Sequence, residues 1–249
     1  MSKTALVDAL KHFDLDQVRA ILQKRPELKE LRLNKGVNIL QFCCGRFTGD
    51  DPAAASRQLR LAKWLVSEGF DPRENYTTAP GDDGEAESAS VSLAWYSVAK
   101  AQNNRLARYF LQQGAAPGAL FAAAWWGNAD IIPDLVRHGA DLNEVVGATP
   151  LHMAVDVVQR GVEGKPELGR RRLTCVNEML RLGANPNIPA HDGTTPLHTA
   201  LKKESLEAFK LLLRHGANPD VPGKDGRTVR EIAGRKKDRR YVSALPRHS

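Results

Sequence analysis

Two histidines and a pair of cysteines are the residues of this sequence that invite a chemical role. His152 and His198 each close a copy of Thr-Pro-Leu-His, and either could be considered as a metal ligand or a catalytic base. Cys43 and Cys44 are adjacent and could form a redox switch, whereas Cys175 stands alone. No Ser/His/Asp set, P-loop or glycine-rich phosphate loop accompanies them. We therefore expect no enzymatic activity, no cofactor and no metal, and we expect the three cysteines to be small buried side chains.

An acidic segment is the other candidate for ion binding. It lies within Tyr76–Ser92, which has four acidic residues, no basic ones and few large apolar ones. The acidic residues are Asp82, Asp83, Glu85 and Glu87, and their spacing does not match a calcium loop. We expect residues 76–92 to form a mobile acidic loop, because the segment has little apolar surface to bury.

The histidines belong to a repeated unit of two helices, which is clearest in residues 192–220. Thr195 can cap the first helix, and Pro196 suits its first position because the missing N–H of proline would be unpaired there. The second helix has apolar residues at helical spacing, and Gly216 ends it. One such unit cannot bury its apolar faces alone, so copies of it must stack.

Copies of this unit occur elsewhere in the chain. Gly-Ala-Asn-Pro is found at 183–186 and again, 33 residues later, at 216–219, and Thr-Pro-Leu-His is found at 149–152 and 195–198. These motifs strongly resemble the ankyrin repeat, whose period is about 33 residues and whose signature is T-P-L-H-x-A. The resemblance implies an all-α solenoid of about seven helix-turn-helix units with irregular insertions. It also implies that the two histidines are structural, with rings that hydrogen-bond the backbone within and between units.

Five of the predicted units share an apolar pair three and four residues before a closing glycine, even where the Thr-Pro-Leu-His motif is absent. We place them in one domain, residues 1–245, with a tail at 246–249. The units cover residues 3–35, 36–72, 90–117, 118–143, 147–187, 192–220 and 225–245. The first and last are polar, as caps must be. Insertions are expected between the two helices of the second unit, at 46–58, and of the fifth unit, at 159–172.

The positive charge of the chain gathers near its C-terminus. Of the net charge of +7, residues 224–249 contribute +6, from nine Lys or Arg and three Asp or Glu. The stretch Arg235–Arg240 has three interpretations: a solubilising cap, a site for an anionic protein, or a site for nucleic acid or anionic lipid. The N-terminus lacks a signal-peptide core, and there is no apolar run of about 18 residues. We expect a cytoplasmic monomer without a membrane span.

Binding of a protein partner is the function that the resemblance implies. Ankyrin solenoids bind with a concave face, made of the exposed side of the inner helices and the tips of the finger loops. The matching inner-helix positions are Phe42, Arg46, Ser97, Lys100, Trp125, Trp126, Met153, Asp156, Thr199 and Lys202, and the matching finger positions are Val145, Val146, His191, Thr194, Lys224 and Arg227. Such a module would bind one protein, as its inhibitor or regulator. The alternative is a nucleic-acid-associated adaptor that uses Arg235–Arg240.

Trp125 and Trp126 end the inner helix of the fourth unit, which has little room for a projecting finger. Their rings could fill the space that the missing finger leaves. They could instead expose an aromatic anchor, the residue type that is enriched in binding hot spots. The two interpretations are compatible, with one ring for each.

Overall fold

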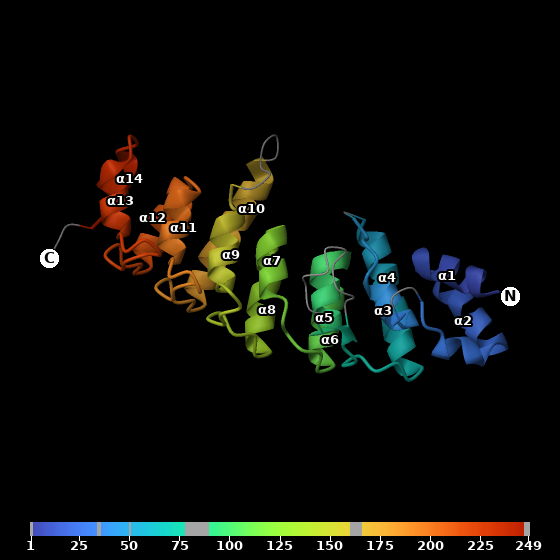
Figure 1. Cartoon of the computed structure of the whole chain (residues 1–249). Coiled ribbons are helices and arrows are strands. Elements are labelled where there is room, and N and C mark those ends of the chain that lie inside the picture. Colours follow the sequence, from blue (N-terminus) through green and yellow to red (C-terminus); the bar gives the residue numbers. More distant parts are fainter. Residues whose placement is uncertain (1, 34–35, 50, 78–89, 160–165, 247–249) are drawn as a thin grey trace. The chain divides into compact units, whose positions relative to one another are not determined.

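The computed structural model describes residues 2–33, 36–49, 51–77, 90–159 and 166–246 (Figure 1). Its chain divides into two compact parts, residues 1–119 and residues 120–249, which we call the N-terminal part and the C-terminal part. Each part is a stack of helix pairs, and we call the first helix of a pair inner and the second outer. The centre of the predicted acidic loop, residues 78–89, lies outside the described residues.

The described residues of the N-terminal part form three helix pairs. They are α1 (Lys3–Lys11) with α2 (Leu15–Lys24), α3 (Ile39–Cys44) with α4 (Pro52–Ser67), and α5 (Leu93–Tyr96), continued by a π-helical turn (Ser97–Ala101), with α6 (Asn104–Gln112). A 3-10 helix, Pro26–Glu30, follows α2. The inner helices pack side by side, as do the outer helices. Two strands of two residues each, β1 (Tyr76–Thr77) and β2 (Ser90–Val91), pair antiparallel and form the one β-sheet among the described segments.

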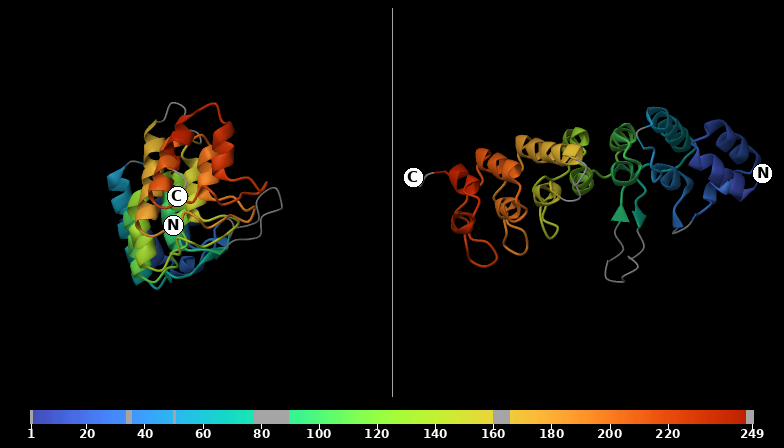
Figure 2. Two further views of the ribbon diagram at one scale, coloured as in Figure 1. Left: turned by 90° about the vertical axis from the view of Figure 1, so that its left-hand side faces the viewer. Right: turned by 90° about the horizontal axis from the view of Figure 1, so that it is seen from above.

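In the C-terminal part, residues 120–159 and 166–246 form four helix pairs. They are α7 (Leu120–Trp126) with α8 (Ile132–Arg137), α9 (Pro150–Val157) with α10 (Pro166–Arg181), α11 (Pro196–Lys202) with α12 (Leu206–Arg214), and α13 (Val229–Arg235) with α14 (Arg240–Ala244). A 3-10 turn, Ala129–Ile131, leads into α8. Within this part the loops that precede α9, α11 and α13 project to the same side (Figure 2).

Local capping explains why the inner helices begin where they do, even in units that lack the Thr-Pro-Leu-His motif. The side chain of Asn38 accepts a hydrogen bond from the backbone N–H of Gln41 at 2.8 Å, and the side chain of Gln41 accepts one from the N–H of Asn38 at 2.8 Å. Thr228 and Glu231 form the same reciprocal box. Each box satisfies backbone donors that would otherwise be unpaired at the start of a helix. The aligned positions of the second and seventh units therefore have equivalent roles.

The later part of each insertion belongs to an outer helix. We expected residues 46–58 to lie between the two helices of the second unit, but α4 begins at Pro52, where the carboxylate of Asp51 accepts a hydrogen bond from the N–H of Ala53 at 2.8 Å. Likewise, α10 begins at Pro166, inside the predicted 159–172 insertion. Proline at the first helical position needs no N–H partner, so each insertion starts a longer outer helix.

The extension of α4 brings a buried amide against the end of its inner helix. Gln58 is 0% exposed, and its side-chain N–H groups donate to the carbonyls of Cys43 at 2.8 Å and Arg46 at 2.9 Å. Its oxygen accepts a hydrogen bond from the amide of Asn103 at 2.9 Å. Gln58 therefore links the C-terminal end of α3 to α4 and, through Asn103, to the start of α6.

Candidate functional site

The predicted binding face of the C-terminal part extends over three neighbouring inner helices. Trp125 belongs to α7, Met153 and Asp156 to α9, and Thr199 and Lys202 to α11. Because α9 packs against both α7 and α11, these positions follow one another across the stack. Trp125 and Lys202 are exposed, and the other three are half-buried.

Exposed apolar surface is concentrated near this face. Trp125 is 37% exposed, Trp126 is 39% exposed, Val145 is 38% exposed and Val146 is 65% exposed. Both indole rings therefore keep more than a third of their surface accessible and are not buried as space-filling groups. The two valines lie in the loop before α9, next to a bridge that pairs Val146 with Ala148. Large aromatic and aliphatic groups in such a position are the usual anchors of protein interfaces.

A buried arginine contacts both the backbone carbonyl and the ring of Trp125. Arg172, in the extension of α10, is 5% exposed and donates hydrogen bonds to the carbonyls of Trp125 at 3.0 Å and Val157 at 2.8 Å. Its guanidinium lies 6.0 Å from the centre of the Trp125 ring. These carbonyls close α7 and α9, where the helix dipole favours a cation. Arg172 thus links the ends of two inner helices and restrains the exposed ring.

The sequence contained a signal for Arg172 that we did not use. The buried face of α10 consists of Arg172, Cys175, Val176, Met179 and Leu180. Residues three and four apart lie on the same side of a helix, so Arg172 continues the apolar stripe by one turn. An arginine at such a position must find hydrogen-bond partners, since burial of an unpaired charge is costly.

The finger residues of the C-terminal part are held by backbone contacts between successive loops. The N–H of His191 donates to the carbonyl of Gly147 at 2.8 Å, which ties the loop before α11 to the loop before α9. His191 is exposed and Thr194 is half-buried, with its hydroxyl 2.6 Å from the carboxylate of Asp192. In the next loop, Lys224 and Arg227 are exposed, and Arg227 is paired with Asp225.

The two signature histidines connect each repeat to the next one. His152 Nδ1 lies 3.2 Å from the backbone nitrogen of Thr149, and its Nε2 lies 2.9 Å from the carbonyl oxygen of Thr194, in the following loop. His198 repeats the arrangement with the nitrogen of Thr195 at 3.3 Å and the carbonyl of Arg227 at 3.3 Å. Both imidazoles are therefore engaged in structural hydrogen bonds.

These contacts determine the tautomer and explain a lowered pKa. A backbone N–H can only donate, so Nδ1 must be unprotonated, and a carbonyl can only accept, so Nε2 must carry the hydrogen. A second proton would sit on Nδ1 against the N–H of the capping threonine. Burial lowers the pKa of both His152 and His198 below the usual value, although the Nε2 hydrogen bonds to the Thr194 and Arg227 carbonyls oppose this shift.

Family comparisons agree with this geometry. A family model of three ankyrin repeats matches residues 169–246, and a model of the single ankyrin repeat matches residues 146–191. The chain is an ankyrin-repeat protein. Over 98 residues it is 36% identical to the human "Ankyrin repeat and SOCS box protein 16". This match covers 39% of the chain and 18% of the relative, so the matched region spans less than a fifth of that protein.

Solved structures show that the whole chain has the ankyrin fold. The human ASB11 ankyrin repeat domain superposes with a TM-score of 0.72 at 18% identity, with 100% of each chain covered. The ankyrin repeat domain of Bcl-3, a member of the IkappaB family, gives 0.69 at 20% identity, with 98% of each covered. An ankyrin repeat domain from Acinetobacter baumannii gives 0.61 at 26% identity and covers 87% of this chain and 100% of its own. Ankyrin repeats generally serve as protein–protein interaction modules.

The repeat histidines make stability depend on pH. Because the folded state lowers the histidine pKa, their stabilising effect is complete above the unfolded-state pKa of about 6.5 and is lost as the pH falls through it toward the folded-state pKa. We expect His198→Ala to lower the free energy of unfolding at pH 7.5 by about 1–3 kcal/mol, by leaving buried backbone groups unpaired. Urea denaturation between pH 5 and 8 measures both effects.

A glutamine at the same position is the matched control. Gln41 occupies the histidine position of the second repeat and keeps the capping box. We therefore expect His198→Gln to lose less stability than His198→Ala and to show a shallower decline in acid than the wild type. Equal stability of His198→Ala and wild type would contradict the structural role of the ring.

In the N-terminal part, the predicted face is less complete. Phe42 is half-buried beneath Arg46, whose guanidinium lies 5.9 Å from the ring centre, and Lys100 is exposed. Ser97 is 0% exposed and its hydroxyl donates to the carbonyl of Leu93 at 2.7 Å, so it is not part of the surface. The turn that begins at Ser97 is π-helical, which changes the register that we inferred from a regular helix. Phe47, 63% exposed, is a surface aromatic that we did not predict.

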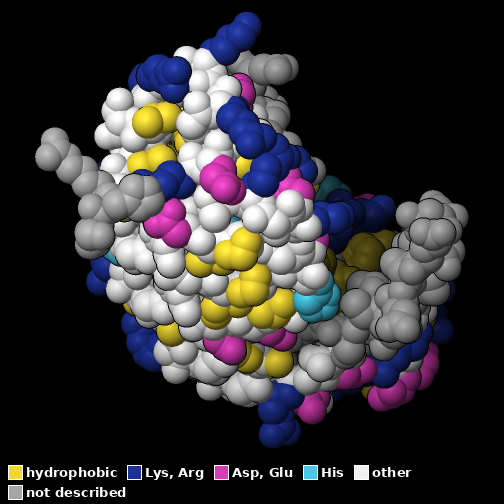
Figure 3. Space-filling view, turned by 60° about the vertical axis from the view of Figure 1, so that its left-hand side comes forward, with side chains coloured by type: hydrophobic (Ala, Val, Ile, Leu, Met, Phe, Trp, Pro, Cys, Tyr) yellow, Lys and Arg dark blue, Asp and Glu magenta, His cyan; other side chains and the backbone are white. Residues whose placement is uncertain are grey.

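The basic stretch Arg235–Arg240 is part of the folded C-terminal repeat. Lys236 pairs with Glu204 at 2.8 Å and lies over the ring of Tyr241, and Arg240 pairs with Asp238 at 2.8 Å. Acidic side chains are interspersed among the Lys and Arg side chains at this end of the molecule (Figure 3). Some of the positively charged side chains therefore take part in the folded structure of the C-terminal repeat.

The thiols have the character of core residues. All three cysteines are buried, and burial raises the pKa of Cys44 and raises that of Cys175 to about 12. A thiol with so high a pKa is a poor nucleophile. In the segments that the structure covers, no three His, Cys, Asp or Glu side chains are placed to share a metal ion. Nor does any helix in those segments have the length and apolar character that crossing a bilayer requires.

Proposed function

We propose that this ankyrin domain is a non-enzymatic binding module for one specific protein, engaged through the inner helices and fingers of the C-terminal part. The exposed ring of Trp125, restrained by Arg172, is the observation that carries the proposal. A restrained aromatic group loses little conformational entropy on binding, which favours a hot spot. An inhibitory or regulatory role for the module would follow if the bound surface of the partner were its own functional site.

The partner-binding positions of this proposal are those that the structure leaves accessible. In the C-terminal part they surround Trp125 and consist of Trp126, Val145, Val146, Met153, Asp156, His191, Thr194, Thr199, Lys202, Lys224 and Arg227. Apolar anchors lie at the α7 end of this set, and cationic side chains lie at the fingers before α13. We expect the apolar group to contribute most of the affinity and the charged rim to influence the association rate.

Replacement of Trp125 tests the proposal. With the partner recovered by affinity purification and mass spectrometry, we expect Trp125→Ala to weaken binding by about 2 kcal/mol or more, which is roughly 30-fold, if Trp125 is a hot spot. Trp125→Phe keeps an aromatic ring and should retain most of the affinity. Titration calorimetry measures both, after circular dichroism has shown that the variants are folded.

The competing role of the basic stretch is tested in the same titrations. A variant with Arg235, Lys236 and Lys237 replaced by alanine should change mainly the salt dependence of binding. A nucleic-acid-associated adaptor would behave in the opposite way, with steeply salt-dependent binding that requires these cations. Loss of binding in the triple variant and not in Trp125→Ala would reject the proposed face in favour of the C-terminal cap.

A further inference from the structure

The outer helices of the N-terminal part carry an unbalanced positive charge. Helices α2, α4 and α6 contain seven Lys or Arg and a single acidic residue, Asp16. The basic residues are Arg19, Lys24, Arg57, Arg60, Lys63, Arg105 and Arg108, and all but the half-buried Arg108 are exposed. Because α4 packs against both α2 and α6, these side chains form one surface. We call it the cationic outer face.

The corresponding helices of the C-terminal part carry a smaller excess of positive charge. Helices α8, α10 and α12 also contain seven Lys or Arg, but they contain four Asp or Glu. Three of these acidic residues form ion pairs with an arginine three positions later, at 2.6–2.8 Å. Such pairs are an ordinary way to keep a solvated helix surface neutral. On the cationic outer face, the structure describes a looser 3.7 Å contact of Arg57 with the helix-capping Asp51.

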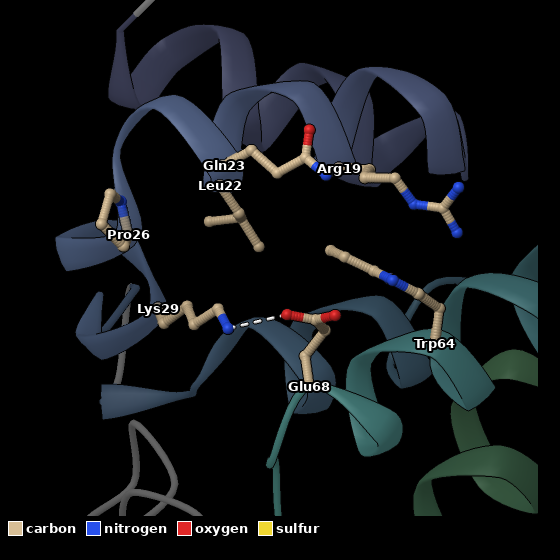
Figure 4. Close-up of a pocket in the computed structure, with 7 residues that line it drawn as sticks. All are labelled: Arg19, Leu22, Gln23, Pro26, Lys29, Trp64 and Glu68. Carbon is tan, nitrogen blue, oxygen red and sulfur yellow. Dashed lines mark hydrogen bonds and ion pairs between the residues drawn. The ribbon is translucent and has the colours of Figure 1, made fainter.

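A pocket opens on this face between α2 and α4. Its volume is about 430 Å³, and Leu22, Pro26 and Trp64 provide apolar lining (Figure 4). Arg19 lies over the indole of Trp64, with its guanidinium 5.5 Å from the ring centre. A volume of this size accommodates a large side chain with its neighbouring backbone. The close-up shows Leu22 and the edge of Trp64 directed toward the centre of the pocket.

The opposite rim of the pocket carries a carboxylate. Glu68 pairs with Lys29 at 2.8 Å, and both side chains remain about one third exposed. A phosphate chain would meet repulsion from Glu68 at this rim, whereas a peptide can present a backbone N–H there. The apolar lining likewise suits a side chain better than a phosphate. Charge complementarity with the rest of the cationic outer face requires the peptide to carry acidic residues on either side of its apolar side chain.

We propose that the cationic outer face is a second docking surface, which binds an acidic protein segment with one apolar side chain inserted beside Trp64. The apolar side chain displaces water from Leu22, Pro26 and Trp64. The flanking carboxylates pair with exposed cations, foremost Arg19 and Arg60. This surface belongs to other helices than the proposed binding face around Trp125, so each proposal can be tested independently of the other.

Selection from a random peptide library tests this inference. A displayed library of 16-residue peptides is selected on the full chain and counter-selected on the double variant Arg19→Glu/Arg60→Glu. We expect the retained peptides to share a large apolar residue flanked by Asp or Glu. Retention of peptides without that pattern, or of none, would overturn the proposal.

Binding of a selected peptide, measured by fluorescence anisotropy, gives the quantitative test. We expect Arg19→Glu/Arg60→Glu to weaken it at least tenfold, and alanine in place of the apolar peptide residue to do the same. Lys210→Glu/Lys237→Glu, the same charge change on the C-terminal part, and Trp125→Ala should leave it within about threefold. Equal weakening by the control pair would show a non-specific charge effect. Displacement of the peptide by a 12-nucleotide oligo(dT) at equal concentration would show a general polyanion site and overturn the proposal.

Discussion

Replacing Arg172 with methionine is expected to destabilise the C-terminal part by about 2–4 kcal/mol. Methionine fills a similar length but leaves the partly buried carbonyl of Trp125 and the buried carbonyl of Val157 without the hydrogen bonds that Arg172 donates. An unsatisfied buried group costs about 1–3 kcal/mol, and hydrogen bonds from a charged donor are stronger than neutral ones. Removal of a buried cation offsets part of the loss, because its desolvation is costly. Urea denaturation followed by circular dichroism measures the difference.

Arg172→Met should also make the ring of Trp125 more mobile. Without the guanidinium, the end of α7 loses its link to α9, so we expect Arg172→Met to weaken partner binding even at temperatures where it is fully folded. Arg170→Met is the control, because Arg170 is 68% exposed and paired with Glu167 on the same helix. We expect that control to change stability by no more than about 0.5 kcal/mol. Equal effects of the two substitutions would show that Arg172 is an ordinary surface arginine.

Replacing Gln58 with leucine is expected to lower the stability of the N-terminal part by a comparable amount, about 2–4 kcal/mol. Leucine matches the shape but removes the donors to Cys43 and Arg46 and the acceptor for Asn103, of which the contacts with Cys43 and Asn103 are buried. Each group that is left unpaired adds a desolvation cost. In a repeat stack the loss should appear first in the helices that share the network, α3 and α6. Hydrogen–deuterium exchange of those helices locates it.

A surface glutamine provides the reference for this experiment. Gln112, in α6, is exposed, and its replacement by leucine should change the free energy of unfolding by no more than about 0.5 kcal/mol. If Gln58→Leu is as stable as Gln112→Leu, the hydrogen bonds of the Gln58 amide add nothing to the free energy of unfolding beyond the packing of its side chain. The amide of Asn103 keeps its hydrogen bond to the carbonyl of Ala55 at 3.1 Å, so the loss falls mainly on the partners of Gln58 in and after α3.

Local signals were sufficient to predict the repeats. Helix starts depend on a capping residue and on the side chain three positions later, so Thr149 with His152 and Asn38 with Gln41 could be placed from spacing alone. The apolar pairs before each closing glycine likewise indicate which face of an outer helix is buried. The roles of His152 and His198, inferred from the family, are confirmed by their contacts with the next loop.

Contacts between residues far apart in the sequence could not be predicted from these local signals. The sequence indicated where extra residues lie, but only the packed structure showed that they lengthen α4 and α10 and bring Gln58 and Arg172 against the ends of inner helices. It also showed that a π-helical turn buries Ser97. The net charge before residue 224 is only +1, which concealed the cationic outer face. Charge along a chain is a sum over all residues, whereas a surface is formed by those that folding places together, here on three adjacent outer helices.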